Sequence, residues 1–227
     1  MKYLLSLLIA TLLVIASCKK DHDDGIPAGE DYGCIDQMFI KTKDHTINSA
    51  DVPTVDKLFS ANRIDNSKFR YYQYKRDSVA IGPPYTIVDR KLIWVEQFDR
   101  DRRVFNGDQI FQFYNDTFNS VGWHTIGYNW VNVSNLDTIP RMSLARVRRL
   151  FRHDLEKYFP TDSNAQRIDY SDTCFIAEFG FYKQLADKYY TAKFYKAWRV
   201  FKKNSVNDRP AGYYDDETGR QLSFYLF

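Results

Sequence analysis

Hydrophobic and polar residues alternate along most of this chain, in short runs rich in aromatic and β-branched side chains. Runs of this kind, bounded by Gly, Pro, Asn or Asp, are typical of β-strands. The clearest breaks between them fall at Gly82-Pro83-Pro84, Asn106-Gly107 and Asn115-Asp116. The pattern predicts strands at residues 35–41, 69–75, 86–98, 108–115, 120–129, 173–182, 192–202, 211–215 and 221–226.

One early stretch departs from this alternation and follows the helical period. Ser49 or Asp51 is placed to cap its start, and Pro53 falls in the first turn, where proline is tolerated. The apolar positions that follow are spaced three or one apart, so that they share a face: Val55, Leu58 and Phe59. These residues predict a short amphipathic helix that precedes the first long strand.

A second helix is predicted near the middle of the chain. Ser143 is a suitable N-cap residue, and Pro160 cannot continue a helix. Between them the apolar residues form one stripe: Leu144, Val147, Phe151, Leu155 and Tyr158. The opposite side is basic, with Arg141, Arg146, Arg148, Arg149 and Arg152. Two interpretations of this basic side remain open, a docking face for an acidic partner or lipid headgroups, and an ordinary water-facing surface.

The order of the elements, a helix followed by strands and then the same again, predicts an α+β fold. We expect two modules of similar build, each a helix packed on an antiparallel sheet. The composition agrees with this expectation, because aromatic residues make up 17% of the chain and there are only 10 Gly, which favours strands. The length is sufficient for one large domain or two small ones.

The N-terminus has the pattern of an export signal. The stretch from Tyr3 to Ala16 is apolar to weakly polar, too short to span a bilayer but suited to the core of a signal peptide at residues 1–17. Its end, Ile15-Ala16-Ser17-Cys18, resembles the lipobox of bacterial lipoproteins, which implies lipidation of Cys18. The alternative is an ordinary secretory signal in which this cysteine has no special role.

Residues 18–33 are polar and acidic with little to bury, so we expect a flexible tether there. Lys followed by acidic residues directly after the lipidated cysteine resembles the surface-export signal of some Gram-negative lipoproteins; a plain spacer is the alternative. The expected location is therefore the outer membrane, on its periplasmic or cell-surface face. A membrane contact through the lipid anchor is the partner that this end of the chain implies.

The net charge and the cysteines bear on the expected partners and on the compartment. The formal net charge is +3, which gives no electrostatic reason to expect nucleic-acid binding. Cys34 and Cys174 remain once Cys18 carries lipid. In an oxidising compartment they can form a disulfide, or each can be a small buried hydrophobic residue, and the sequence leaves both alternatives open.

Four stretches, in order, resemble a known family of propeptide modules. In residues 94–123, Gln97, Val104, Phe105 and Gly107 match the pattern of the fungalysin and thermolysin propeptide (FTP) module. The segment IPRMSLARVRRLF is similar to the helix opening of the adjoining PepSY module. Two departures weaken the match, since Asn106 intrudes before Gly107 and Asn115-Asp116 lacks the family's glycine.

The end of the chain resembles the end of a PepSY module. The stretches FYKAWRVFKK and GYYDDETGRQLSFYLF place an Ala-Trp pair and an Asp-x-x-Thr-Gly turn in the family's order, at Ala197, Trp198, Asp215, Thr218 and Gly219. The resemblance covers residues 51–227 and implies two cystatin-like/PepSY-like modules, at residues 34–138 and 139–227. In that family such modules inhibit or help to fold a metalloprotease and carry no catalytic residues.

Motifs of catalysis are missing from the sequence. None of the four His is followed by Glu, so the His-Glu-x-x-His motif of zinc proteases does not occur. No Gly-x-Ser-x-Gly or phosphate-binding glycine loop occurs either. We therefore expect a protein that is not an enzyme, with no catalytic residues, no metal site and no cofactor.

Two functions follow as hypotheses. The first is a membrane-anchored lipoprotein that recognises another protein, such as a protease that it inhibits or a client that it chaperones. The second is a surface-exposed lipoprotein that binds a glycan or a peptide. Trp123, Tyr128 and Trp130 are the candidate binding residues for the second, because such rings can stack on a ligand; core packing is the alternative for them.

Overall fold

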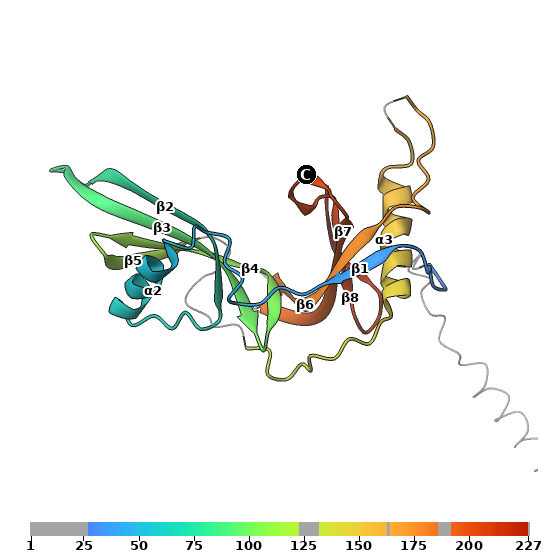
Figure 1. The fold of residues 1–227 in the computed structure, drawn as a ribbon, viewed down its shortest axis with the longest axis horizontal. Coiled ribbons are helices and arrows are strands. Elements are labelled where there is room, and N and C mark those ends of the chain that lie inside the picture. Colours follow the sequence, from blue (N-terminus) through green and yellow to red (C-terminus); the bar gives the residue numbers. More distant parts are fainter. Residues whose placement is uncertain (1–26, 123–131, 163, 186–191, 227) are drawn as a thin grey trace, which may run out of the picture.

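The structure is a computed structural model that describes residues 27–122, 132–162, 164–185 and 192–226. Within these ranges nine strands form one mixed β-sheet, and two helices pack on it, α2 (Val52–Ala61) and α3 (Leu144–Tyr158) (Figure 1). The predicted α+β class is confirmed. In place of separate antiparallel sheets, backbone hydrogen bonds connect all nine strands.

The N-terminal half of the sheet is an antiparallel meander. It contains β2 (Phe69–Ile81), β3 (Thr86–Asp99), β4 (Arg102–Tyr114) and β5 (Thr117–Gly122), each paired with the next. Helix α2 covers one face with the three apolar residues that its period predicted, Val55, Leu58 and Phe59, all of which are buried. The predicted strand at 120–129 corresponds to β5 as far as Gly122, and residues 123–129 lie outside the described part of the chain.

The C-terminal half of the sheet holds β6 (Phe175–Leu185), β7 (Ala192–Lys202), β8 (Ala211–Asp215) and β9 (Gln221–Tyr225), also in antiparallel order. A turn of 3-10 helix, η1 (Val206–Asp208), lies between β7 and β8. The short β1 (Ile35–Met38) pairs with β6 in parallel. Although the sequence predicted that residues 34–138 form one module, this strand lies in the half of the sheet that holds α3.

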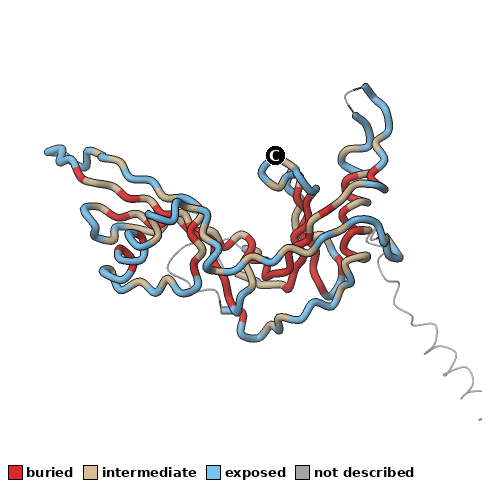
Figure 2. Tube along the Cα trace, viewed as in Figure 1, coloured by how far each residue is buried: buried red, intermediate tan, exposed pale blue. Residues whose placement is uncertain are grey.

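Helix α3 packs on the C-terminal half as its apolar stripe predicted. Val147, Phe151 and Leu155 are buried against residues of β6, β7 and β8. The predicted cap is confirmed, since the side chain of Ser143 accepts a hydrogen bond from the amide of Arg146 at 3.1 Å. Figure 2 shows the buried residues gathered along the centre of the sheet and beneath the helices, with exposed residues at the outer end of the β2–β3 hairpin.

The two halves meet where the start of β4 pairs in parallel with β6, at Val104–Phe181 and Phe105–Tyr182. The break predicted at Asn106-Gly107 is therefore wrong, because both residues lie inside β4. The chain reverses earlier, at Arg100 and Asp101, whose φ angles of 47° and 57° are left-handed. Two-residue hairpin turns need positive φ, and the absence of glycine at these two positions hid the turn from the sequence.

Gly180 permits the close approach of β4 and β6. A Cβ atom at this position would lie 2.4 Å from the carbonyl oxygen of Arg103. Gly180→Ala is therefore expected to lower the free energy of unfolding by about 1–3 kcal/mol, as overpacking does in well-packed interiors. Urea titration measures this loss. Gly122→Ala in β5 is the control, because its Cβ would meet no atom closer than 4.0 Å; equal effects of the two variants would contradict the account.

The closing hairpin follows its predicted turn chemistry. Gly219 has a φ of 76°, and the side chain of Asp215 accepts hydrogen bonds from the amides of Glu217 and Thr218. The adjacent Asp216 is fully buried and accepts a hydrogen bond from the indole of Trp198 at 2.9 Å. Its carboxylate also accepts hydrogen bonds from the backbone amides of residues 141 and 142. This turn therefore holds the segment that leads into α3.

The residues just before β1 lie along α3 instead of extending freely. Asp31 forms ion pairs with Arg148 and Arg152, and its amide bonds to the carbonyl of Ala145 at 3.0 Å. Arg146 donates to the carbonyl of Gly29 at 3.2 Å. The sequence predicted a flexible tether through Gly33, whereas from Pro27 onward the acidic and carbonyl groups of this segment bind the arginines of α3.

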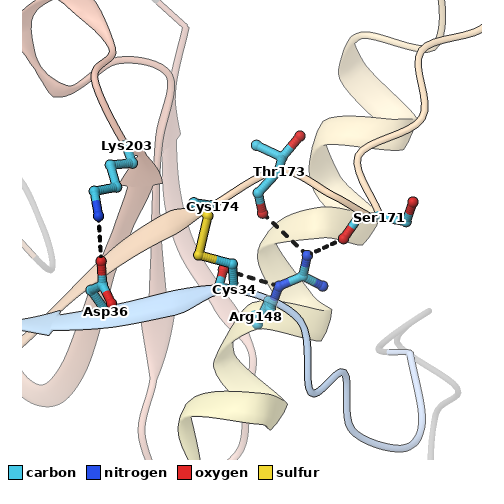
Figure 3. Close-up of a disulfide and its surroundings, with 7 residues drawn as sticks. All are labelled: Cys34, Asp36, Arg148, Ser171, Thr173, Cys174 and Lys203. Carbon is cyan, nitrogen blue, oxygen red and sulfur yellow. Dashed lines mark hydrogen bonds and ion pairs between the residues drawn. A yellow bond between two sulfur atoms is a disulfide. The ribbon is translucent and has the colours of Figure 1, made fainter.

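Both interpretations of the basic side of α3 are wrong for Arg148, because its side chain is completely buried. Figure 3 shows its guanidinium directed toward three backbone carbonyls, of Cys34 at 3.2 Å, Thr173 at 3.1 Å and Ser171. The guanidinium also lies over the ring of Phe175, 5.2 Å from its centroid. This arginine is therefore an internal connector between α3, the segment before β1 and the segment before β6.

Candidate functional site

A cleft of about 560 Å³ opens at the junction of the two halves of the sheet. Strands β2, β4, β6, β7, β8 and β9 all contribute to its lining, together with η1. The lining is mostly polar and aromatic: Ile110 and Ala211 are the only aliphatic side chains among the described residues that line it. Small-molecule sites are usually lined mainly by hydrophobic and aromatic side chains; this lining has the aromatic rings but few aliphatic groups.

A β-bulge in β4 shapes one wall of the cleft. The register between β3 and β4 jumps from Gln97–Val104 to Val95–Gln109, so residues 105–108 have no regular partner in β3. Asn106 lies in this bulge with a left-handed φ of 59°. Bulges redirect side chains and are common beside functional sites. Here the bulge brings Asn106 and Asp108 into the lining of the cleft.

The floor of the cleft on the β4 side is formed by Arg103, which buried ion pairs hold in place. The carboxylate of Glu96 lies 2.6 Å from a guanidinium nitrogen of Arg70 and 2.8 Å from one of Arg103. Burial alone would lower the pKa of Arg103, but the nearby charges of Glu96 and Glu178 raise it above its ordinary value. Arg103 is therefore a permanent cation held in a fixed position.

The floor continues toward η1 through a second arginine. Arg199 lies 3.4 Å from the carboxylate of Glu178 and 3.0 Å from that of Asp208. Burial raises the pKa of Glu178, against the opposing effect of Arg103 and Arg199. At the rim, Asp108 lies 3.8 Å from Arg103. The charges of Arg103 and Arg199 are thus largely neutralised by the carboxylates that they contact.

Tyrosine side chains make up the aromatic part of the lining. The rings of Tyr182 and Tyr213 lie 5.3 Å apart, and those of Tyr213 and Tyr225 lie 5.5 Å apart. Tyr225 donates a hydrogen bond to Asn106 at 3.2 Å, which links β9 to the bulge. Burial raises the pKa of Tyr182 to about 12 and that of Tyr72, on the opposite wall, to about 12 as well. These phenols remain protonated at neutral pH, so they can donate and accept hydrogen bonds.

A wider depression of about 980 Å³ lies beside α2 and contains His45. The imidazole stacks on Tyr71 with ring centroids 4.4 Å apart, and its Nδ1 accepts the amide hydrogen of Tyr71. Burial lowers the pKa of His45. The hydroxyl of Tyr71 donates a hydrogen bond to the carboxylate of Asp56 at 2.7 Å. These contacts hold the segment before β2 against the sheet, which is a structural role.

The candidate residues from the sequence fall in different places. Cys34 and Cys174 form a disulfide with an S–S distance of 2.05 Å, the alternative that the sequence could not decide. Cys18, the predicted lipidation site, lies outside the described residues, and so do Trp123, Tyr128 and Trp130. Of the described candidates, neither Cys34 nor Cys174 lines the cleft.

Sequence reasoning missed the cleft. Its residues come from seven elements, and the pairing of β4 with β6 that brings them together joins positions 77 residues apart, Val104 with Phe181. The one local signal was the high tyrosine content, 17 in the chain. That number alone does not tell tyrosines of a cleft from tyrosines of a core.

Two further observations concern the described ranges only. Neither of their α-helices has the length and apolar character needed to cross a membrane. No group of three or more His, Cys, Asp or Glu side chains comes together there in a way that could hold a metal ion.

Comparisons with known proteins gave no relative on which to base a function. No protein-family model matches the chain, and no curated protein sequence or solved structure is significantly similar to it.

Proposed function

We propose that this protein is a non-catalytic lipoprotein that acts by binding a partner at the junction of the two halves of its sheet. The cleft carries this proposal, because fixed donors, acceptors and aromatic rings from seven elements converge there. The floor charges are engaged in ion pairs with one another, an arrangement suited to recognition. The lipobox-like residues Ile15-Ala16-Ser17-Cys18 support the membrane anchor, and the disulfide agrees with an oxidising compartment outside the cytoplasm.

We further propose that the two halves are cystatin-like modules related to the FTP and PepSY propeptide modules. Separate buried cores support this, one beneath α2 and one beneath α3. The helix-on-sheet build of each half, the Ser143 cap and the turn at Gly219 are the features that the resemblance implies. A protein partner, in particular a metalloprotease, is then the first candidate.

The protease hypothesis predicts inhibition. Micromolar purified protein is expected to slow the turnover of a thermolysin-like protease on a peptide substrate. Tyr225→Ala, in the cleft, should weaken inhibition, while Tyr85→Ala at the exposed tip of the β2–β3 hairpin should not. Undiminished turnover at a large excess of the protein would eliminate protease inhibition as the function.

The second candidate is a surface-exposed lipoprotein that binds a glycan or a peptide. The specific observation that favours it is the lining of the cleft, with four tyrosines and few aliphatic groups. A ligand in such a cleft is recognised by hydrogen bonds and ring contacts more than by apolar burial.

The membrane anchor has its own test. Cells that express the protein and are fed a labelled palmitate analogue are expected to incorporate the label, and Cys18→Ala should abolish incorporation because no thiol then accepts the lipid. The same cells provide a control in Cys34→Ala, which alters a disulfide cysteine and should still be labelled. Label on the Cys18→Ala protein, or none on the natural one, would refute the anchor.

A further inference from the structure

We infer that the cleft at the sheet junction binds an uncharged, hydroxyl-rich ligand of the class of a neutral sugar chain. The inference rests on the proposed binding function and specifies the chemistry of the ligand. Three observations carry it: the balance of charge on the floor, the mixture of donors and acceptors, and the row of tyrosine rings.

The balance of charge argues against an ionic ligand. Arg103 and Arg199 already face Glu96, Glu178 and Asp208. A carboxylate or phosphate on the ligand would have to displace one of these carboxylates or accept an uncompensated charge in a partly buried site, which is costly.

Two lining cations lie outside this network. Lys183 directly follows Tyr182 in β6, so its side chain leaves the opposite face of the strand. Arg209 is exposed at the edge of the cleft and has no ion pair with a described residue. An acidic ligand would therefore depend on Arg209. Replacing this residue distinguishes an acidic ligand from an uncharged one.

The donors and acceptors match hydroxyl groups. A hydroxyl both donates and accepts, so one ligand hydroxyl can bond to a carboxylate and to a phenol or guanidinium at once. The cleft offers both kinds of partner close together, because the side chains of Asp108 and Asp208 are 43% and 46% exposed beside arginines. Sites of this type reject analogues that lack the hydroxyl, since their polar groups are then left unpaired.

Tyr225, which is 36% exposed, supplies the apolar contact that a ring-shaped ligand needs. The largely buried rings of Tyr213 and Tyr182 support it from behind, with successive ring centroids 5.5 and 5.3 Å apart. A tyrosine offers a flat apolar body and a polar tip. The volume of about 560 Å³ is within the usual range of small-ligand sites, roughly 300–1,000 Å³.

Titration calorimetry on the lipidated full-length mature protein in detergent micelles tests the inference. The probes are hexasaccharides of α-glucan, β-glucan, mannan and xylan, with an oligogalacturonate as the acidic sugar and a hexaglutamate peptide as the acidic peptide. At least one neutral probe is expected to bind. Tyr225→Ala should weaken that binding about tenfold or more, as loss of an aromatic anchor does.

Matched variants give the test its controls. Tyr85→Ala removes a tyrosine that is 80% exposed outside the cleft, and it should change affinity less than about twofold. Arg209→Ala should leave the neutral probe bound. Binding of the oligogalacturonate or the peptide alone, lost in Arg209→Ala, would overturn the neutral ligand and leave the binding function standing. No binding by any probe would overturn the inference, and protease inhibition weakened by Tyr225→Ala would still uphold the cleft as a binding site.

Discussion

Replacing Arg148 with methionine is expected to lower the free energy of unfolding by about 3–5 kcal/mol, the usual effect of removing one member of a buried ion pair. Methionine keeps much of the apolar volume but removes every donor. The carbonyls of Ser171 and Thr173 then lose this donor in the interior, and Asp31 keeps only Arg152 of its two ion pairs. Urea unfolding followed by tryptophan fluorescence measures the change.

Arg149→Met is the matched control for this variant. Arg149 is the next residue of the same helix, and its side chain has no ion pair or hydrogen bond with a described residue. Its replacement should shift the free energy of unfolding by no more than about 0.5 kcal/mol. If the two variants lose equal stability, the contacts of Arg148 are not what holds the segment before β1.

The pH dependence gives a second readout. Partial burial works to raise the pKa of Asp31, but the amide of Gly33 and the charge of Arg148 lower it below its usual value of 3.8. A carboxyl whose pKa is depressed by folding contributes stability above its unfolded pKa and loses it as the pH falls through the folded pKa. The difference between the natural protein and Arg148→Met should therefore narrow in acid.

Removal of the disulfide is the second large effect that we expect. Cys34 and Cys174 are separated by 140 positions, and closing so long a loop restricts the unfolded chain. The double variant Cys34→Ala and Cys174→Ala is expected to be less stable by about 2–5 kcal/mol. Urea titration with and without dithiothreitol measures the loss.

The reducing agent also supplies the control. Dithiothreitol should bring the natural protein to the stability of the double variant and should leave the double variant unchanged. Natural protein that keeps its full stability under complete reduction would show that the bond is not a stabilising connection between β1 and β6.

Local signals predicted the parts of the fold that depend on neighbouring residues. The cap at Ser143 and the period of the apolar stripe located α3, and the bounds predicted for β7 and β8 are those observed. Turn residues such as Asn115-Asp116 marked the β4–β5 hairpin, where both have positive φ. Each of these features is determined by residues within one turn of a helix or one hairpin.

Features that depend on distant residues escaped prediction. The union of the two halves needs the contact of β4 with Gly180 in β6, which no local pattern encodes. Arg148 lies four residues after Leu144 and three before Phe151, beside the apolar stripe, but its charge favoured a place in solvent. It is buried because Asp31 and backbone carbonyls from two segments surround its charge. The cleft was hidden for the same reason, since its tyrosines converge only after β6 pairs with β4.

The Cys34–Cys174 bond has a mechanical consequence for a chain that is tethered at Cys18, as we propose. A pull on the lipid reaches Asp31 and Cys34 first, and the covalent link passes it straight to the start of β6. The 139 positions between the two cysteines, which include α2 and its meander, lie outside this covalent path. Of the strands that line the proposed cleft, β2 and β4 belong to this bypassed part of the chain.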